Sequence, residues 1–139
     1  MKRGKLSIVA LLLLFSVAVS MFSTTASAEE KQIMPRFDNA INIYTQFNIV
    51  NGNAVASISY NGYEGIFTEA HVYVKLEKRN LLVFWKDVTE WETVSYNSTD
   101  SIEFTYPVDS GKYRATIRVE IFGTSGTSDV VENELKADC

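Results

Sequence analysis

Residues 113–121 read YRATIRVEI, and this stretch decides the fold because apolar and polar side chains alternate along its whole length. Successive side chains of a β-strand point to opposite faces, so this alternation buries one face and leaves the other in water. An amphipathic α-helix would instead place apolar residues three and four positions apart. The stretch is therefore predicted to be a β-strand of an antiparallel sheet that packs on one face only.

Similar extended stretches lie on both sides of this strand, and turn signals separate them. Asn51-Gly52 is typical of a tight hairpin turn because both residue types tolerate positive φ angles, and Asn61-Gly62 is predicted to end the strand that follows it. Ile41 is predicted to begin the inward face of the first strand. We predict an all-β fold, a single antiparallel β-sandwich of about seven strands, with a small closed barrel as the alternative. The other predicted strands cover residues 41–49, 54–60, 70–77, 81–88, 102–106 and 131–135.

The N-terminal segment 1–28 has the three parts of a secretory signal peptide. A cationic start at Lys2, Arg3 and Lys5 precedes an apolar run, and Ala26-Ser27-Ala28 is an A-x-A cleavage signal. The apolar run is shorter than the ~20 residues that a membrane-spanning helix needs. We therefore expect a secreted, extracellular protein. The expected organisation is a signal peptide over 1–28, an N-terminal tail over 29–40 and the sandwich domain over 41–139.

Cleavage would leave an acidic chain. Three of the 13 basic residues lie in 1–28, so ten basic and all 17 acidic residues remain and the net charge becomes −7. Such a charge disfavours binding to nucleic acid, and we expect no membrane partner after signal cleavage. Cys139 is the single cysteine, so no disulfide forms within the chain, and an intermolecular disulfide or a free thiol are the alternatives.

The corner before the deciding strand resembles that of immunoglobulin-like domains. Residues 109–115 read DSGKYRA, similar to the D-x-G-x-Y-x-C stretch of that family. The resemblance implies that the hydroxyl of Tyr113 bonds back to the backbone upstream. It also implies that Ala115, with Ala56 as its partner, takes the place of the inter-sheet disulfide. The implied topology is immunoglobulin-like or fibronectin type III-like.

A second resemblance, to a family of small secreted proteins from Gram-positive bacteria, covers roughly residues 33–135. It is carried by short motifs at both ends of the domain and between them. They are Pro35-Arg36-Phe37, Leu76-Glu77-Lys78 followed by Trp85 and Trp91, the corner Gly111-Lys112-Tyr113-Arg114 and the turn Gly123-Thr124-Ser125-Gly126. The resemblance implies an immunoglobulin-like or fibronectin type III-like sandwich in a family with no assigned activity.

Few residues offer catalytic chemistry. His71 is the single histidine and is predicted to face outward, and the sequence has neither a G-x-S-x-G motif nor a zinc or calcium motif. We expect no cofactor, no metal and no catalytic residue. The alternative is a small carbohydrate-active hydrolase that uses Glu90 and Glu92, since glycoside hydrolysis requires two carboxylates about 5–10 Å apart.

Aromatic side chains carry the main functional hypothesis. Tyr44 and Tyr73 are predicted on outward faces, Tyr96 near a loop, and Trp91 either in the core or at a contact surface. Exposed rings bind sugars or protein partners by stacking and by burial of apolar area. We therefore expect a non-enzymatic binding module for a protein or glycan partner at or outside the cell surface, with Tyr44, Tyr73, Tyr96 and Trp91 as candidate contacts.

Overall fold

The computed structural model describes residues 36–81 and 83–139. The predicted signal peptide and most of the predicted N-terminal tail lie outside these residues. The described part contains seven strands and no helix, so it contains no helix able to cross a membrane. The strands are β1 (Ala40–Val50), β2 (Asn53–Gly62), β3 (Phe67–Arg79), β4 (Trp85–Ser95), β5 (Thr99–Pro107), β6 (Lys112–Gly123) and β7 (Ser128–Asp138).

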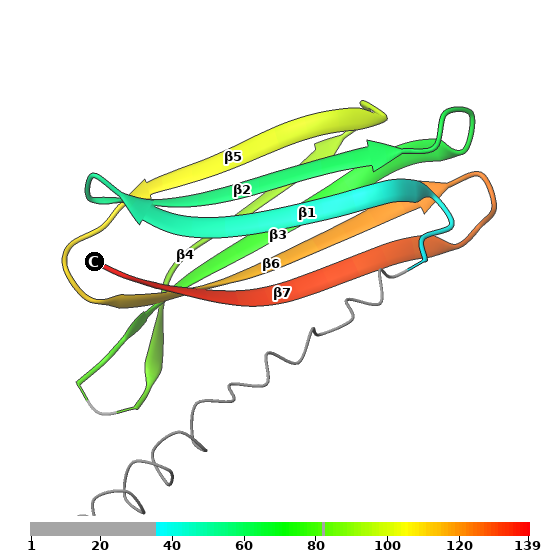
Figure 1. Cartoon of the computed structure of the whole chain (residues 1–139). Helices are drawn as coiled ribbons and strands as arrows, with labels where there is room; N and C mark the ends of the chain where they lie inside the picture. Colours follow the sequence, from blue (N-terminus) through cyan, green and yellow to red (C-terminus); the bar gives the residue numbers. More distant parts are fainter. Residues whose placement is uncertain (1–35, 82) are drawn as a thin grey trace, which may run out of the picture. The chain divides into compact units, whose positions relative to one another are not determined.

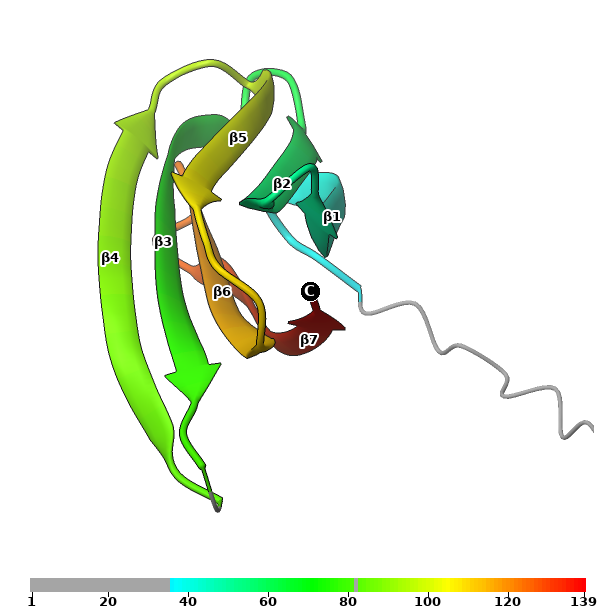
Figure 2. The same ribbon diagram turned by 90° about the vertical axis from the view of Figure 1, so that its left-hand side faces the viewer.

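The strands form two antiparallel sheets that face each other, as Figures 1 and 2 show. One sheet has the order β1-β2-β5 and the other the order β4-β3-β6-β7. The fourth strand pairs with the third, whereas constant-type immunoglobulin domains pair it with the fifth. The predicted β-sandwich is therefore confirmed, in a fibronectin type III-like strand order, and the barrel alternative is wrong.

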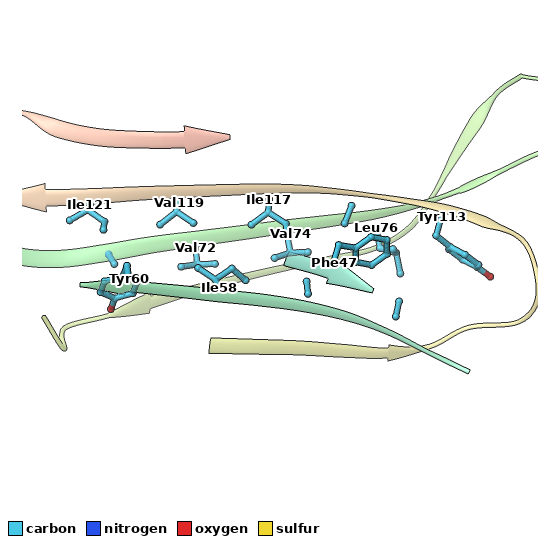
Figure 3. Packing of buried hydrophobic residues seen from close by; sticks show 14 of the residues in the cluster. Phe47, Ile58, Tyr60, Val72, Val74, Leu76, Tyr113, Ile117, Val119 and Ile121 are labelled. Carbon is cyan, nitrogen blue, oxygen red and sulfur yellow. The ribbon is translucent and has the colours of Figure 1, made fainter. Parts of the chain in front are cut away.

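Alternating residues from both sheets fill the space between them (Figure 3). Residues 113–121, at the centre of β6, are buried at every second position. Strand β3 of the same sheet and strand β2 of the other sheet follow the same pattern. Ala56 and Ala115 are both buried in this cluster, one from each sheet, as the immunoglobulin resemblance implies. The fully buried side chains include Ile58, Val72, Val74, Leu76, Ile117, Val119 and Ile121.

The corner before β6 has the hydrogen bonds that the resemblance predicts. The Tyr113 hydroxyl lies 2.9 Å from the Asp109 carbonyl oxygen and 2.6 Å from its carboxylate, to which it donates. Lys78 Nζ lies 2.6 Å from the same carboxylate oxygen and 5.6 Å from the centre of the Tyr113 ring. Hydrogen bonds from Lys78 and then Tyr113 lower the pKa of Asp109 to about 2. Burial and the bond to Asp109 raise the pKa of Tyr113.

The lowered pKa of Asp109 predicts an acid-sensitive contribution to stability. A carboxylate with a depressed folded-state pKa stabilises the fold above its ordinary pKa near 4 and loses that effect as the pH falls toward 2. We expect Asp109→Asn to be less stable than the parent by a constant amount above about pH 5, and this difference to shrink progressively as the pH falls through 4 to about 2 and below. Urea unfolding across this range measures it. The control is Asp138→Asn, and a difference for Asp109→Asn that is as large at pH 2 as at pH 6 would contradict the assignment.

A buried polar clamp ties the start of β1 to the β6–β7 hairpin. The Asp129 carboxylate accepts hydrogen bonds from the backbone N–H groups of Asp38, Asn39 and Ala40, at 2.9, 2.6 and 3.1 Å. The Asn39 side chain is fully buried and donates to the carbonyl oxygens of Ile121 and Thr127. The ordered structure therefore includes residues just before position 41, where the predicted domain begins.

Two details of the predicted strands are wrong. Ile41 is exposed because the β1–β2 register shifts between Ala40 and Asn42, and the extra residue of this bulge turns outward. The strand predicted over 81–88 begins only at Trp85 and continues to Ser95. Among the described residues before Trp85, Leu81, Val83 and Phe84 belong to the connection between β3 and β4.

Candidate functional site

The outer face of the β1-β2-β5 sheet carries almost no charge. The strand register aligns its side chains in rows across the three strands, such as Tyr44–Ser59–Ser101. The remaining rows are Asn42–Asn61–Thr99, Gln46–Ser57–Glu103, Asn48–Val55–Thr105 and Val50–Asn53–Pro107. Glu103 is the single ionisable carboxylate among these residues, and most of the others have amide or hydroxyl side chains. The face can therefore both donate and accept many neutral hydrogen bonds.

The Tyr44 ring lies at the edge of a hollow on this face. The hollow has a volume of about 540 Å³, and its walls include Asn42, Ser59, Asn61 and Ser101 beside Tyr44. Tyr44 is 57% exposed, a large fraction for an aromatic side chain in the middle of a strand. An exposed ring beside amide and hydroxyl groups is chemically suited to a ligand that has both an apolar face and many hydroxyl groups.

Local hydrogen bonds hold the walls of this hollow. The Thr99 hydroxyl donates to Asn61 Oδ1 at 2.8 Å, which links β5 to β2. Asp100, at the rim, accepts a hydrogen bond of 2.6 Å from the Ser95 hydroxyl. That bond, with smaller contributions from the Ser101 backbone N–H and the Asn97 side chain, lowers the pKa of Asp100. The charges near the hollow are therefore negative, which disfavours an anionic ligand.

Tyr73 lies on the outer face of the other sheet. A smaller hollow of about 240 Å³ surrounds it, with His71, Glu92, Arg118 and Glu120 in its walls. Burial, and then the negative charge of Glu90, raise the pKa of Tyr73. His71 faces outward as predicted, and its Nε2 atom lies 3.0 Å from a Glu69 carboxylate oxygen. This second hollow has cationic and anionic side chains in its walls, whereas Asp100 is the charged side chain in the walls of the hollow beside Tyr44.

The other two candidate aromatics lie elsewhere. Trp91 faces the core and stacks on Phe104, with ring centres 5.4 Å apart. Tyr96 is exposed in the β4–β5 connection, three residues before Thr99. The structure therefore does not bring the four predicted contacts onto one face. Tyr44 is the candidate that stands beside a hollow whose walls are neutral apart from Asp100.

The carboxylates of the hydrolase alternative are exposed on an edge strand. Glu90 and Glu92 lie on the outer face of β4, opposite Lys75 and Tyr73 of β3. Among residues 36–81 and 83–139, no group of three or more His, Cys, Asp or Glu side chains is arranged to hold a metal ion. Cys139 is exposed with a free thiol, and its pairing with a second chain stays a prediction.

Comparison with known proteins provides no family assignment. The sequence matches no protein-family model, and it has no significant match among curated proteins. The resemblance to small secreted proteins of Gram-positive bacteria therefore stays a prediction from short motifs.

Proposed function

We propose that the chain is a secreted, non-enzymatic binding module that takes a neutral glycan on the outer face of the β1-β2-β5 sheet. The single observation that carries the proposal is the exposed Tyr44 ring beside a hollow lined by amide and hydroxyl groups, with Asp100 as its charged residue. Sugar rings stack their C–H faces on aromatic side chains, while their hydroxyl groups exchange hydrogen bonds with groups of this kind. Secretion is proposed from the signal-peptide pattern of residues 1–28.

A glycan suits this face better than a protein partner. Protein interfaces usually have an apolar centre that is rich in aromatic residues and Arg. Here the two rows beside Tyr44 consist of Asn, Ser, Gln and Thr together with Glu103, and they have no apolar side chain. The nearby carboxylates Asp100 and Glu103 favour a neutral over an anionic saccharide. The alternation of polar side chains along three paired strands also provides an extended surface, which suits a polymer.

The first test is a glycan array followed by depletion assays with insoluble cellulose and chitin. We expect binding to a neutral saccharide and a loss of affinity of roughly tenfold or more for Tyr44→Ala, because the side chain is the stacking surface. Tyr73→Ala is the matched control, since it removes a tyrosine from the outer face of the other sheet. Isothermal titration with the array's best soluble ligand gives the affinities.

Three results would contradict the proposal. They are no binding above background to any neutral saccharide, equal affinity of Tyr44→Ala and the parent, and loss of binding in Tyr73→Ala instead. The third result would move the site to the charged hollow on the β4-β3-β6-β7 sheet. Because Tyr44 is exposed, its replacement is not expected to unfold the domain, and circular dichroism checks this.

A further inference from the structure

The connection between β3 and β4 exposes apolar side chains at a projecting tip. Leu81 is 98% exposed, Phe84 75% and Val83 67%, whereas the connections elsewhere in the described chain expose no such group of three. Figures 1 and 2 both show this hairpin reaching beyond the ends of the neighbouring strands. Soluble proteins seldom keep a contiguous apolar group in water unless it contacts something. We name Leu81, Val83 and Phe84 the apolar tip.

Cationic side chains surround the base of this tip on both sides of the sheet. Lys78 and Lys86 are directly opposite each other in the β3–β4 register. Arg79 and Lys112 continue the outward-facing rows of β3 and β6. Within the described residues, Arg79, Lys86 and Lys112 are exposed and form no ion pair. Lys78 is paired with Asp109, so Arg79, Lys86 and Lys112 are the cations without an ion pair among the described residues here.

A hollow of about 650 Å³ lies between the tip and these cations. Its walls include Lys78, Arg79, Lys112, Ser110 and Leu81. Carboxylates are also present at this end of the domain, and two of them, Asp87 and Glu77, are paired with Lys75 and Arg114. Asp109 is paired with Lys78, and Asp138 is opposite Lys112 in the β6–β7 register without an ion pair to it. Because cationic side chains are in excess, the hollow is suited to bind an anionic group. The apolar side chains beside it are suited to contact hydrocarbon.

We propose that this hairpin docks the protein on an anionic phospholipid membrane. The apolar tip enters the boundary between headgroups and acyl chains, and Arg79, Lys86 and Lys112 bind the lipid phosphates. The chain as a whole is acidic, with a formal net charge of −4. An anionic surface therefore repels most of the domain and attracts this end, which orients the molecule with the hairpin toward the membrane. The attraction between this cationic end and the membrane outweighs the repulsion expected from the net charge of the chain.

The shape of the site favours a membrane over an acidic peptide. The tip projects, whereas a peptide-binding site is usually a groove or a strand edge that encloses the ligand. The cations lie on both faces of the hairpin, so a flat or fluid surface that meets the tip end-on contacts them together. An extended peptide would lie along one face and reach only half of them.

The test is co-sedimentation of the purified full-chain product with vesicles. One set contains phosphatidylglycerol and phosphatidylcholine in equal amounts, and the other contains phosphatidylcholine alone. We expect binding to the mixed vesicles and weak binding to the neutral ones. Arg79→Gln/Lys112→Gln and, separately, Leu81→Ser/Phe84→Ser are each expected to reduce binding to the mixed vesicles roughly tenfold or more. Added salt is expected to weaken binding of the parent protein.

Matched variants control for charge and for surface hydrophobicity. Arg36→Gln/Arg118→Gln removes the same number of charges away from the hairpin, and Ile66→Ser removes an exposed apolar residue from the β2–β3 connection. Both are expected to bind like the parent. All proteins share the same N-terminus, so any contribution of residues 1–35 is common to them.

Each of three results would overturn the proposal. The first is no binding to the mixed vesicles. The second is equal binding of the parent protein to both kinds of vesicle. The third is equal loss in the hairpin variants and their controls. Soluble poly-glutamate is the peptide probe. If it binds through Arg79 and Lys112 but not through Leu81 and Phe84, and the vesicles do not bind, the site is one for acidic peptides and the membrane proposal is wrong.

Discussion

Asp129→Ala is expected to lower the free energy of unfolding by about 4 kcal/mol, among the largest effects of any single side chain in the described chain. Its carboxylate accepts three backbone hydrogen bonds, and two of the donors, Asn39 and Ala40, are fully buried. Without the carboxylate these two buried N–H groups lose their acceptor, and each unsatisfied buried group costs about 1–3 kcal/mol. Urea unfolding followed by circular dichroism measures the loss.

The matched control is Asp138→Ala, which removes the same side chain from the exposed end of the same strand. It is expected to change stability by less than about 0.5 kcal/mol. Amide hydrogen exchange adds a local measurement, because Asn39 and Ala40 should lose protection in Asp129→Ala before the centre of β6 does. Equal stability of Asp129→Ala and Asp138→Ala would show that the clamp at the start of β1 contributes nothing measurable.

The central strands are predictable from the sequence because burial and alternation coincide there. Residues 113–121 alternate without interruption, and the inward residues of β6 and β3 are the fully buried ones. The corner at Tyr113 is also predictable, since its hydrogen bond back to Asp109 depends on residues only four positions apart. Local patterns of this kind need no knowledge of which strands pair.

The strand predictions are wrong where burial depends on residues distant in the sequence. Ile41 continues the apolar alternation of β1, but the register shift beside Ala40 turns it into solvent. Leu81, Val83 and Phe84 have the composition of a buried strand, yet they form the exposed tip of a hairpin. Apolar composition predicts burial only when something is available to cover the residue, and the sequence contains no local signal for that.

The candidate surfaces depend on strand pairing even more strongly. Alternation correctly places Tyr44 outward, but its neighbours Ser59 and Ser101 come from β2 and β5 through the register. The same alternation places Tyr73 outward on a different sheet, so the two tyrosines cannot share a ligand within one domain. The cations beside the apolar tip come from three strands, and net charge contains no information about where they gather.

Ile117→Ala is the second large expected effect, a loss of about 4 kcal/mol in the free energy of unfolding. Ile117 is fully buried at the centre of β6, between Val74 of β3 and Asn133 of β7. Figure 3 shows its side chain pointing into the space between the sheets. Alanine leaves a cavity that neighbours from both sheets can fill only in part. The chain has one cysteine, so no internal disulfide offsets this loss.

Two further variants separate packing from strand propensity. Ile117→Val keeps the β-branched shape and removes one methylene group, so we expect a loss of about 1 kcal/mol. Thr116→Ala removes a β-branched residue from the adjacent, outward-facing position, so it reports the propensity change with little cavity, and we expect less than about 1 kcal/mol. A loss for Thr116→Ala as large as that for Ile117→Ala would attribute the effect to strand propensity. A large loss for Ile117→Ala with small losses for Ile117→Val and Thr116→Ala would attribute the effect to packing between the sheets. This packing holds the two sheets together, and with them the Tyr44 face and the cationic hairpin.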